Sequence, residues 1–188
     1  QNLPIQILTV WAFSSDDWKR SDDEVKALMS IYETGITEAI PELLEKNMRF
    51  VYLGRKDRIP KSLKELVEKI ENQTKENTSR IFCVALDFSG QDQEIRMMKK
   101  VRLLSKNTKI DLSVIKKLRD AEGLIPPADL IIRTSGEYRT SDLGWLSQNS
   151  EFYIINKFLP DARNQDFLKA VLDYTKRERR FGGRVKWI

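Results

Sequence analysis

The chain has 188 residues, of which 40% are hydrophobic and 32% charged, the usual mix of a globular protein. It contains no histidine and one cysteine, Cys83, which excludes histidine-based catalysis, histidine metal sites and internal disulfides. Metal binding and acid–base chemistry are therefore left to carboxylates. The formal net charge of +5 fits a nucleic acid, an anionic membrane surface or a small polyanion such as a diphosphate, and equally a basic surface with no binding role.

Strand-like and helical runs alternate along the chain. Apolar runs rich in β-branched and aromatic residues predict strands at residues 4–13, 48–54, 80–88, 128–134 and 151–156. Periodic apolar patterns predict a long helical stretch headed by Ser21 with apolar positions up to Leu44, and a second helix that opens at Pro60 and Ser62 and has its buried side at Leu63 to Ile70. Further helices are predicted at residues 91–104, 112–121 and 164–180. Ser21 with Glu24 forms a capping box for the first helix, which Gly35 and Pro41 could bend or break, and Asn164 is the expected N-cap of the last helix. This alternation predicts one α/β domain with a mostly parallel central sheet flanked by helices.

Ligands of such sheets gather beyond the carboxyl ends of the strands. That rule selects three loops, "SSDDWKR", "DFSGQDQ" and "RTSGEYRTSD".

The third loop has the side chains of an anion site. Arg133 and Arg139 offer planar forks of donors that match phosphate oxygens, and Ser141 adds a hydroxyl. Gly136 allows a turn that directs backbone amides at an anion, and Glu137 would orient the arginines or accompany a divalent cation. The alternative is a solvated loop with local arginine–glutamate pairs.

Three further features are weaker. Ser14, Trp18 and Arg20 follow the first strand and would reach the same crevice if the first and fourth strands are neighbours, but they also suit an ordinary turn. Glu151 begins the fifth strand and could be a carboxylate ligand of Mg²⁺, or simply a strand-edge glutamate. The arginines of "RERRFGG", Arg179 among them, could bind phosphate or nucleic acid, or stabilise the C-terminus of the last helix.

Taken in order, "LTVWAFSSDDWKR", "FVYLGRKDRIP", "VALDFSGQDQEI", "ADLIIRTSGEYRTSD", Glu151 before "FYI", and "RERRFGG" resemble the cis-prenyltransferases, in particular the undecaprenyl diphosphate synthase or isoprenyl transferase branch. The resemblance covers essentially the whole chain. It implies an Mg²⁺-dependent homodimer, built around a mainly parallel sheet, that condenses isopentenyl diphosphate onto an allylic diphosphate, usually farnesyl diphosphate.

The resemblance also implies roles for individual residues. Arg133, Arg139 and Ser141 match residues that bind isopentenyl diphosphate, and Glu137 matches a residue that supports that site. Glu151 matches a metal-linked glutamate. Ser14, Trp18 and Arg20 match residues that help to place the substrates. Arg179, in the C-terminal segment, matches an arginine that is lent to the partner's diphosphate site.

The chain departs from the family pattern in three places. The stretch "SDLGWLSQNSE" up to Glu151 is about one residue shorter than in the family. Residues Asp87, Ser89 and Gln91 stand where the family has Asn, Gly and Arg. The family's N-terminal loop of the type Asp-Gly-Asn-Gly-Arg-Trp-Ala, which binds the allylic diphosphate and Mg²⁺, does not occur in the 188 residues. We therefore expect a single domain over residues 1–188 that is N-terminally incomplete and inactive by itself.

Two other functions stay open at this point. One is a non-catalytic accessory subunit or truncated homologue of a cis-prenyltransferase, and the other is a basic nucleic-acid-binding domain. For the enzyme we expect a cytoplasmic location, transient contact with a membrane surface because the product is a long lipid, and no nucleic-acid partner.

Overall fold

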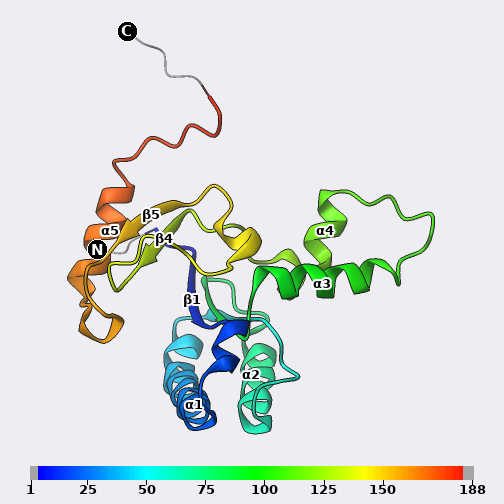
Figure 1. Cartoon of the computed structure of the whole chain (residues 1–188), viewed down its shortest axis with the longest axis horizontal. Coiled ribbons are helices and arrows are strands. Elements are labelled where there is room, and N and C mark those ends of the chain that lie inside the picture. The colour runs from blue at the N-terminus through cyan, green and yellow to red at the C-terminus, as the bar shows by residue number, and fades with distance from the viewer. Residues whose placement is uncertain (1–3, 184–188) are drawn as a thin grey trace. The chain divides into compact units, whose positions relative to one another are not determined.

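The computed structural model describes residues 4–183, which fold into two compact units. The first unit ends at Ile125 and the second begins at Pro126. The first unit contains a parallel sheet in the order β1-β3-β2 (Figure 1). Its strands are β1 (Ile7–Phe13), β2 (Met48–Leu53) and β3 (Arg80–Leu86). Its helices are α1 (Asp22–Glu45), α2 (Lys61–Thr74), α3 (Gly90–Val101) and α4 (Leu112–Leu118), with short 3₁₀ helices η1 (Ser15–Lys19) and η2 (Asp120–Gly123).

Helix α1 begins where its capping box predicts. The Ser21 hydroxyl accepts a hydrogen bond from the Glu24 amide at 3.3 Å, which satisfies one of the free N–H groups of the first turn. The helix then continues to Glu45 with both Gly35 and Pro41 inside it, so neither residue breaks it. Met29, Ile36 and Leu43, seven residues apart, mark its buried stripe.

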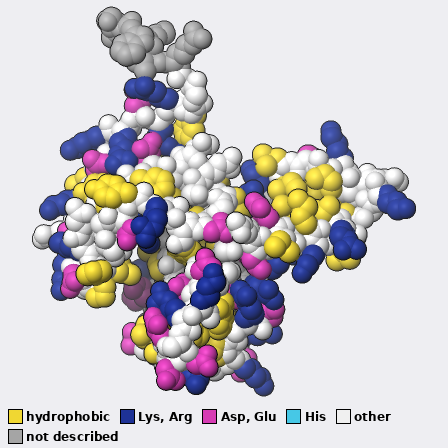
Figure 2. Space-filling view, viewed as in Figure 1, with side chains coloured by type: hydrophobic (Ala, Val, Ile, Leu, Met, Phe, Trp, Pro, Cys, Tyr) yellow, Lys and Arg dark blue, Asp and Glu magenta, His cyan; other side chains and the backbone are white. Residues whose placement is uncertain are grey.

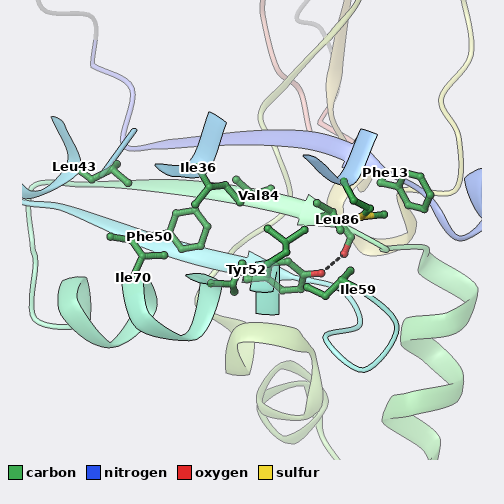
Figure 3. Packing of buried hydrophobic residues seen from close by; sticks show 12 residues of the cluster. Phe13, Ile36, Leu43, Phe50, Tyr52, Ile59, Ile70, Val84 and Leu86 are labelled. Atoms are coloured by element: carbon green, nitrogen blue, oxygen red, sulfur yellow. Dashed lines mark hydrogen bonds between the residues drawn. The ribbon is translucent and has the colours of Figure 1, made fainter. Parts of the chain in front are cut away.

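Helices α1 and α2 lie side by side and pack against the sheet, and the main core fills the space between them (Figures 1 and 3). Phe50, Val84 and Leu86 supply the sheet side, while Ile36 of α1 and Ile70 of α2 face them. The Tyr52 hydroxyl lies in this core and donates to the Leu86 carbonyl at 2.7 Å. Burial of these apolar side chains supplies most of the stabilisation of the unit.

The outer edge of β2 is closed by side chains instead of another strand. Backbone amides on this edge donate to side-chain oxygens at 3.0–3.1 Å. The pairs are Phe50 with Thr74, Tyr52 with Glu71, and Gly54 with Asp120. An edge whose amides are already paired is a poor template for adding a further strand.

The second unit contains a parallel pair of strands, β4 (Leu130–Arg133) and β5 (Glu151–Ile154), with Arg133 opposite Ile154 at the carboxyl ends. Helix α5 (Asn164–Tyr174) packs against both strands. Two 3₁₀ helices, η3 (Gly144–Ser147) and η4 (Leu159–Asp161), lie in the connections.

The predicted α/β class, with parallel strands flanked by helices, is confirmed; the five strands are divided between a three-stranded and a two-stranded sheet. The last helix differs from its prediction. Arg163 is its N-cap and Asn164 its first residue, and it ends at Tyr174, before the arginine segment. None of the helices in the described range combines the length and apolar character that a membrane span requires.

Candidate functional site

The loop after β1 is organised by the carboxylate of Asp17. One oxygen of Asp17 accepts the amide and the hydroxyl of Ser14 at 2.7 and 2.8 Å, and the other accepts Nε of Arg20 at 2.9 Å. Burial by itself raises the pKa of Asp17, but the hydrogen bonds from Ser14 and Arg20 outweigh it and hold that pKa below its usual range. Arg20 also pairs with Glu24 at 2.6 Å and stays exposed. Ser14 and Arg20, two of the predicted residues, are thus connected through Asp17, which was not predicted as a site residue.

The third predicted residue of this loop, Trp18, is tied to the end of β3. Its indole N–H donates to Oδ1 of Asp87 at 2.8 Å, and its ring packs edge-on against Phe13. Asp87 is fully buried and also binds Arg58, whose Nε lies 2.7 Å from its Oδ2. Arg58 comes from the loop after β2, so Asp87 joins three segments that follow three parallel strands.

In the second unit, Arg133 is the last residue of β4. Its Nε is buried without a hydrogen-bond partner among the described residues. The next residues turn sharply, since Ser135 and Gly136 both have φ of 65°. The amides of Ser135 and Gly136 donate to the carbonyls of Lys157 and Ile155 at 2.7 and 3.1 Å. The expectation that these amides face an anion is therefore wrong, because the end of β5 already uses them, whereas the Arg133 side chain has an unmet donor.

The rest of the loop projects outward. Arg139 pairs with Glu137, and its side chain is 75% exposed. Ser141 is exposed as well. Glu137 is therefore placed to orient Arg139, as predicted, whereas it forms no hydrogen bond or ion pair with Arg133 in the described structure.

Glu151 lies at the start of β5 and is already paired. Its Oε2 lies 3.0 Å from Nη1 of Arg177, which also binds Asp173 at 2.5 Å. In residues 4–183 no group of three or more Asp, Glu or Cys side chains is arranged to hold a metal ion. Glu151 therefore supplies a single carboxylate, and an Mg²⁺ ion held there would take its other oxygen ligands from substrate phosphates and water.

The arginine segment after α5 is bound back onto the second unit. Arg179 pairs with Asp129, donates to the Tyr174 hydroxyl at 3.1 Å and packs over the Phe181 ring at 4.5 Å. The helix ends at Tyr174, before this segment, whose side chains contact residues next to β4 and β5. The interpretation of the cluster as a helix C-terminus is therefore wrong.

Sequence reasoning missed Asp17, Arg58, Asp87 and Arg177 as members of these networks. Asp87 was visible only as a departure from the family's Asn. A sequence pattern does not reveal a partner 29 or 69 positions away, which is the separation of Asp87 from Arg58 and Trp18.

The fold and these loops define an α/β protein with arginine and hydroxyl side chains at the carboxyl ends of parallel strands, as in enzymes that bind phosphorylated substrates. On the face shown in Figure 2, Lys and Arg are interspersed with Asp and Glu, and hydrophobic side chains gather over α3 and α4.

Comparison with known proteins identifies the class. Residues 1–182 match the family model described as "Putative undecaprenyl diphosphate synthase". The isoprenyl transferase of Streptococcus thermophilus (strain CNRZ 1066) is 37% identical over 190 residues, covering 96% of this chain and 76% of that protein. The ditrans,polycis-undecaprenyl-diphosphate synthase ((2E,6E)-farnesyl-diphosphate specific) of Buchnera aphidicola subsp. Baizongia pistaciae is 34% identical over 183 residues, covering 95% and 73%.

A solved structure agrees. Lavandulyl diphosphate synthase from Lavandula x intermedia, in complex with dimethylallyl diphosphate, superimposes with a TM-score of 0.87 at 29% identity, over 95% of this chain and 79% of that one. The chain belongs to the undecaprenyl diphosphate synthase family, the cis-prenyltransferases. Because the named relatives are enzymes, a transferase is favoured over a non-catalytic accessory subunit.

Proposed function

We propose that the protein condenses isopentenyl diphosphate onto an allylic diphosphate, with farnesyl diphosphate as the first choice, to form a cis-polyprenyl diphosphate. Two relatives support the allylic substrate: the Buchnera enzyme is described as farnesyl-diphosphate specific, and the lavender structure holds dimethylallyl diphosphate. We propose further that residues 1–188 act as one cis-prenyltransferase-like domain.

The observation that carries this proposal is the state of Arg133. Its guanidinium sits at the carboxyl end of a parallel strand with a buried, unpartnered Nε, and leaving such a donor unsatisfied costs ~1–3 kcal/mol. A diphosphate oxygen would satisfy the donor and compensate the charge. Arg139 and Ser141 would hold the same isopentenyl diphosphate from the exposed part of the loop, and Glu137 would orient Arg139.

On the first unit, the proposal assigns Ser14, Trp18 and Arg20 to substrate placement. Arg20 is exposed and its partners Asp17 and Glu24 are near the surface, so a diphosphate can replace them at small cost. Ser14 and Trp18 are held by Asp17 and Asp87, which gives the loop a defined shape before substrate arrives.

The chemistry needs charge stabilisation and positioning more than a nucleophile. Cleavage of the allylic C–O bond leaves a diphosphate with an additional negative charge, and arginine side chains stabilise charge that develops at such a place. The alkene of isopentenyl diphosphate then attacks the allylic carbon, and a proton is lost to give the cis double bond. Arg133, Arg139 and Ser141 contribute by holding that alkene in register.

Magnesium and Arg179 belong to the proposal with narrower roles. Glu151 would be the one protein carboxylate to hold Mg²⁺, which when bound would supply positive charge that stabilises the leaving diphosphate. Arg179, which is paired with Asp129 and packs over Phe181, would exchange Asp129 for a diphosphate of the partner's site.

A homodimer and a cytoplasmic location with transient membrane contact complete the proposal. Exposed apolar side chains on and before α5, namely Phe158, Leu159, Leu168 and Leu172, support the dimer. The membrane contact is supported by the chemistry of the product, a long lipid.

Isothermal calorimetry of the 188-residue chain with isopentenyl diphosphate tests the assignment of the site. We expect Arg133→Ala and Arg139→Ala each to weaken binding at least tenfold, and Lys157→Ala, a nearby exposed cation, to leave it within twofold. Unchanged binding by both arginine variants would show that this loop is not the isopentenyl diphosphate site. Incorporation of labelled isopentenyl diphosphate with farnesyl diphosphate and Mg²⁺ by the protein tests the reaction.

A further inference from the structure

Asp87 occupies an unusual position at the end of the central strand. It follows β3, its side chain has 0% exposure, and its φ of 52° lies in the left-handed region. For a residue other than glycine that region costs about 1–2 kcal/mol. A buried carboxylate adds a desolvation cost, which its partners must offset. The fold therefore maintains two unfavourable features at one residue, and such positions cluster at functional sites.

Every oxygen of the Asp87 side chain is used. Oδ1 accepts the Trp18 indole N–H at 2.8 Å and also pairs with Nη2 of Arg58, while Oδ2 accepts Nε of Arg58 at 2.7 Å. The Asp87 backbone carbonyl accepts the Arg55 amide at 3.1 Å. One residue thus fixes the loop after β1 through Trp18 and the loop after β2 through Arg58 and Arg55.

One edge of the Arg58 guanidinium group is paired, and its remaining nitrogen, Nη1, is not. Asp87 uses its Nε and Nη2, and Nη2 also approaches Ser15 Oγ at 3.4 Å. Nη1 has no hydrogen-bond partner in residues 4–183, and the side chain is 35% exposed. The guanidinium carbon lies 5.7 Å from the centre of the Trp18 ring, so the two side chains also support each other. An arginine fixed along one edge by a buried carboxylate is preorganised to donate from its other edge.

The two ion pairs of this surface differ in how readily they open. Arg20 pairs with carboxylates near the surface and can leave them, whereas Arg58 is paired with a carboxylate that solvent does not reach. Arg58 therefore cannot exchange Asp87 for a ligand and can bind one only through Nη1. Its place in the sequence, outside the loops that the α/β rule selected, explains why it was not predicted.

We infer that Asp87 is a positioning residue that fixes Trp18 and Arg58, and that Nη1 of Arg58 is an additional contact to a substrate diphosphate. The inference rests on the proposed diphosphate function. Asp87 acts through the two side chains that it holds and does not touch the substrate.

The test uses the 188-residue chain labelled with 5-fluorotryptophan, with the ¹⁹F resonance of Trp18 assigned by its loss in Trp18→Phe. Inorganic pyrophosphate is the probe, and isopentenyl and farnesyl diphosphate in parallel titrations identify which diphosphate uses this contact. In wild type we expect the Trp18 resonance to move on titration. In Asp87→Asn we expect that resonance to be displaced in the free protein and the dissociation constant for pyrophosphate to rise about tenfold.

Asp120→Asn is the matched control. Asp120 also accepts a two-point pair from Arg96, with Nη2 at 2.7 Å, and a backbone amide from Gly54, so the variant loses a comparable network away from Trp18. In this variant the Trp18 resonance should keep its wild-type chemical shift. The dissociation constant for pyrophosphate should stay within twofold of the wild-type value. Arg58→Lys is the second variant in case Asp87→Asn does not fold: it keeps a charge beside Asp87 and loses Nη1, and a tenfold weaker binding is expected.

The outcomes separate the two proposals. If wild type binds none of the diphosphates, the proposed function fails and this inference with it. If wild type binds but Arg58→Lys and any folded Asp87→Asn protein bind equally well, only the inference is overturned.

Discussion

Glu151 and Arg177 form an ion pair, with Oε2 to Nη1 at 3.0 Å, that joins the first residue of β5 to the segment after α5. Arg177 also donates to the Phe152 carbonyl at 2.8 Å, so it contacts the first two residues of β5. The carboxylate that the resemblance links to the metal is thus occupied by a cation of its own chain. A magnesium ion that binds Glu151 has to compete with Arg177.

This competition gives different predictions for the two partners. Glu151→Gln should raise the Mg²⁺ concentration for half-maximal activity about tenfold, whereas Arg177→Gln should leave it unchanged or lower it. Arg177→Gln should lose more stability in urea than Glu151→Gln, because it also loses the contacts with Asp173 and the Phe152 carbonyl. An Mg²⁺ dependence that is the same in both variants would reduce Glu151 to a structural residue.

Gly54 and Gly35 predict opposite effects of the same substitution. Gly54 has φ of +120°, and an added Cβ would lie 2.8 Å from the Asp87 carbonyl oxygen and closer still to that of Leu86. Both contacts are with backbone, which cannot move aside, so Gly54→Ala should destabilise the protein by about 3 kcal/mol or more.

Gly35 is the control for this prediction. It lies inside α1, and nothing is within 4 Å of a Cβ built there, so Gly35→Ala should stabilise by ~0.5–1 kcal/mol. Urea unfolding followed by circular dichroism measures both. Equal effects of the two substitutions would contradict the backbone conformation described for Gly54.

Sequence patterns predicted the elements of this fold better than its networks. The runs at β2 and β3 are nearly continuous in apolar residues, so strands were the natural interpretation. The end of α5 was not predictable, because the residues after Tyr174 favour a helix locally and leave it for contacts such as Arg177 with Glu151. The role of Asp87 was hidden for the same reason, since a residue's long-range partners leave no periodic signal. For the candidate site, arginines and serines marked the loops, but only the structure distinguishes the unpartnered Nε of Arg133 from the paired Arg139.

The proposed dimer predicts a change of assembly on α5. Leu168 and Leu172 lie one turn apart on this helix and are 43% and 48% exposed. Burying such side chains against a second copy is favourable, and a charge there is costly, so Leu168→Glu with Leu172→Glu should convert the dimer to a monomer. Sedimentation velocity measures the change. Ile31→Glu on α1, where the side chain is 62% exposed, is the matched control and should sediment as wild type. A double variant that stays dimeric would place the interface elsewhere.

The loop after β1 predicts a pH dependence of stability. The pKa of Asp17 is lower in the folded protein than in the unfolded chain, because Ser14 and Arg20 donate to its ionised form and outweigh the effect of burial. A depressed carboxyl pKa stabilises the fold above the unfolded value of about 3.9, and this contribution is lost as the pH falls through the folded value. Asp17→Asn should therefore be less stable than wild type at pH 7, and the difference should shrink steadily below pH ~4. Urea unfolding of both proteins from pH 7 to pH 3 measures this difference in stability.

Asp16→Asn, which removes an exposed carboxylate that pairs with Lys19, should show a much smaller difference over the same range. A gap between wild type and Asp17→Asn that stays constant with pH would mean that hydrogen-bond geometry, and not the charge of Asp17, holds this loop.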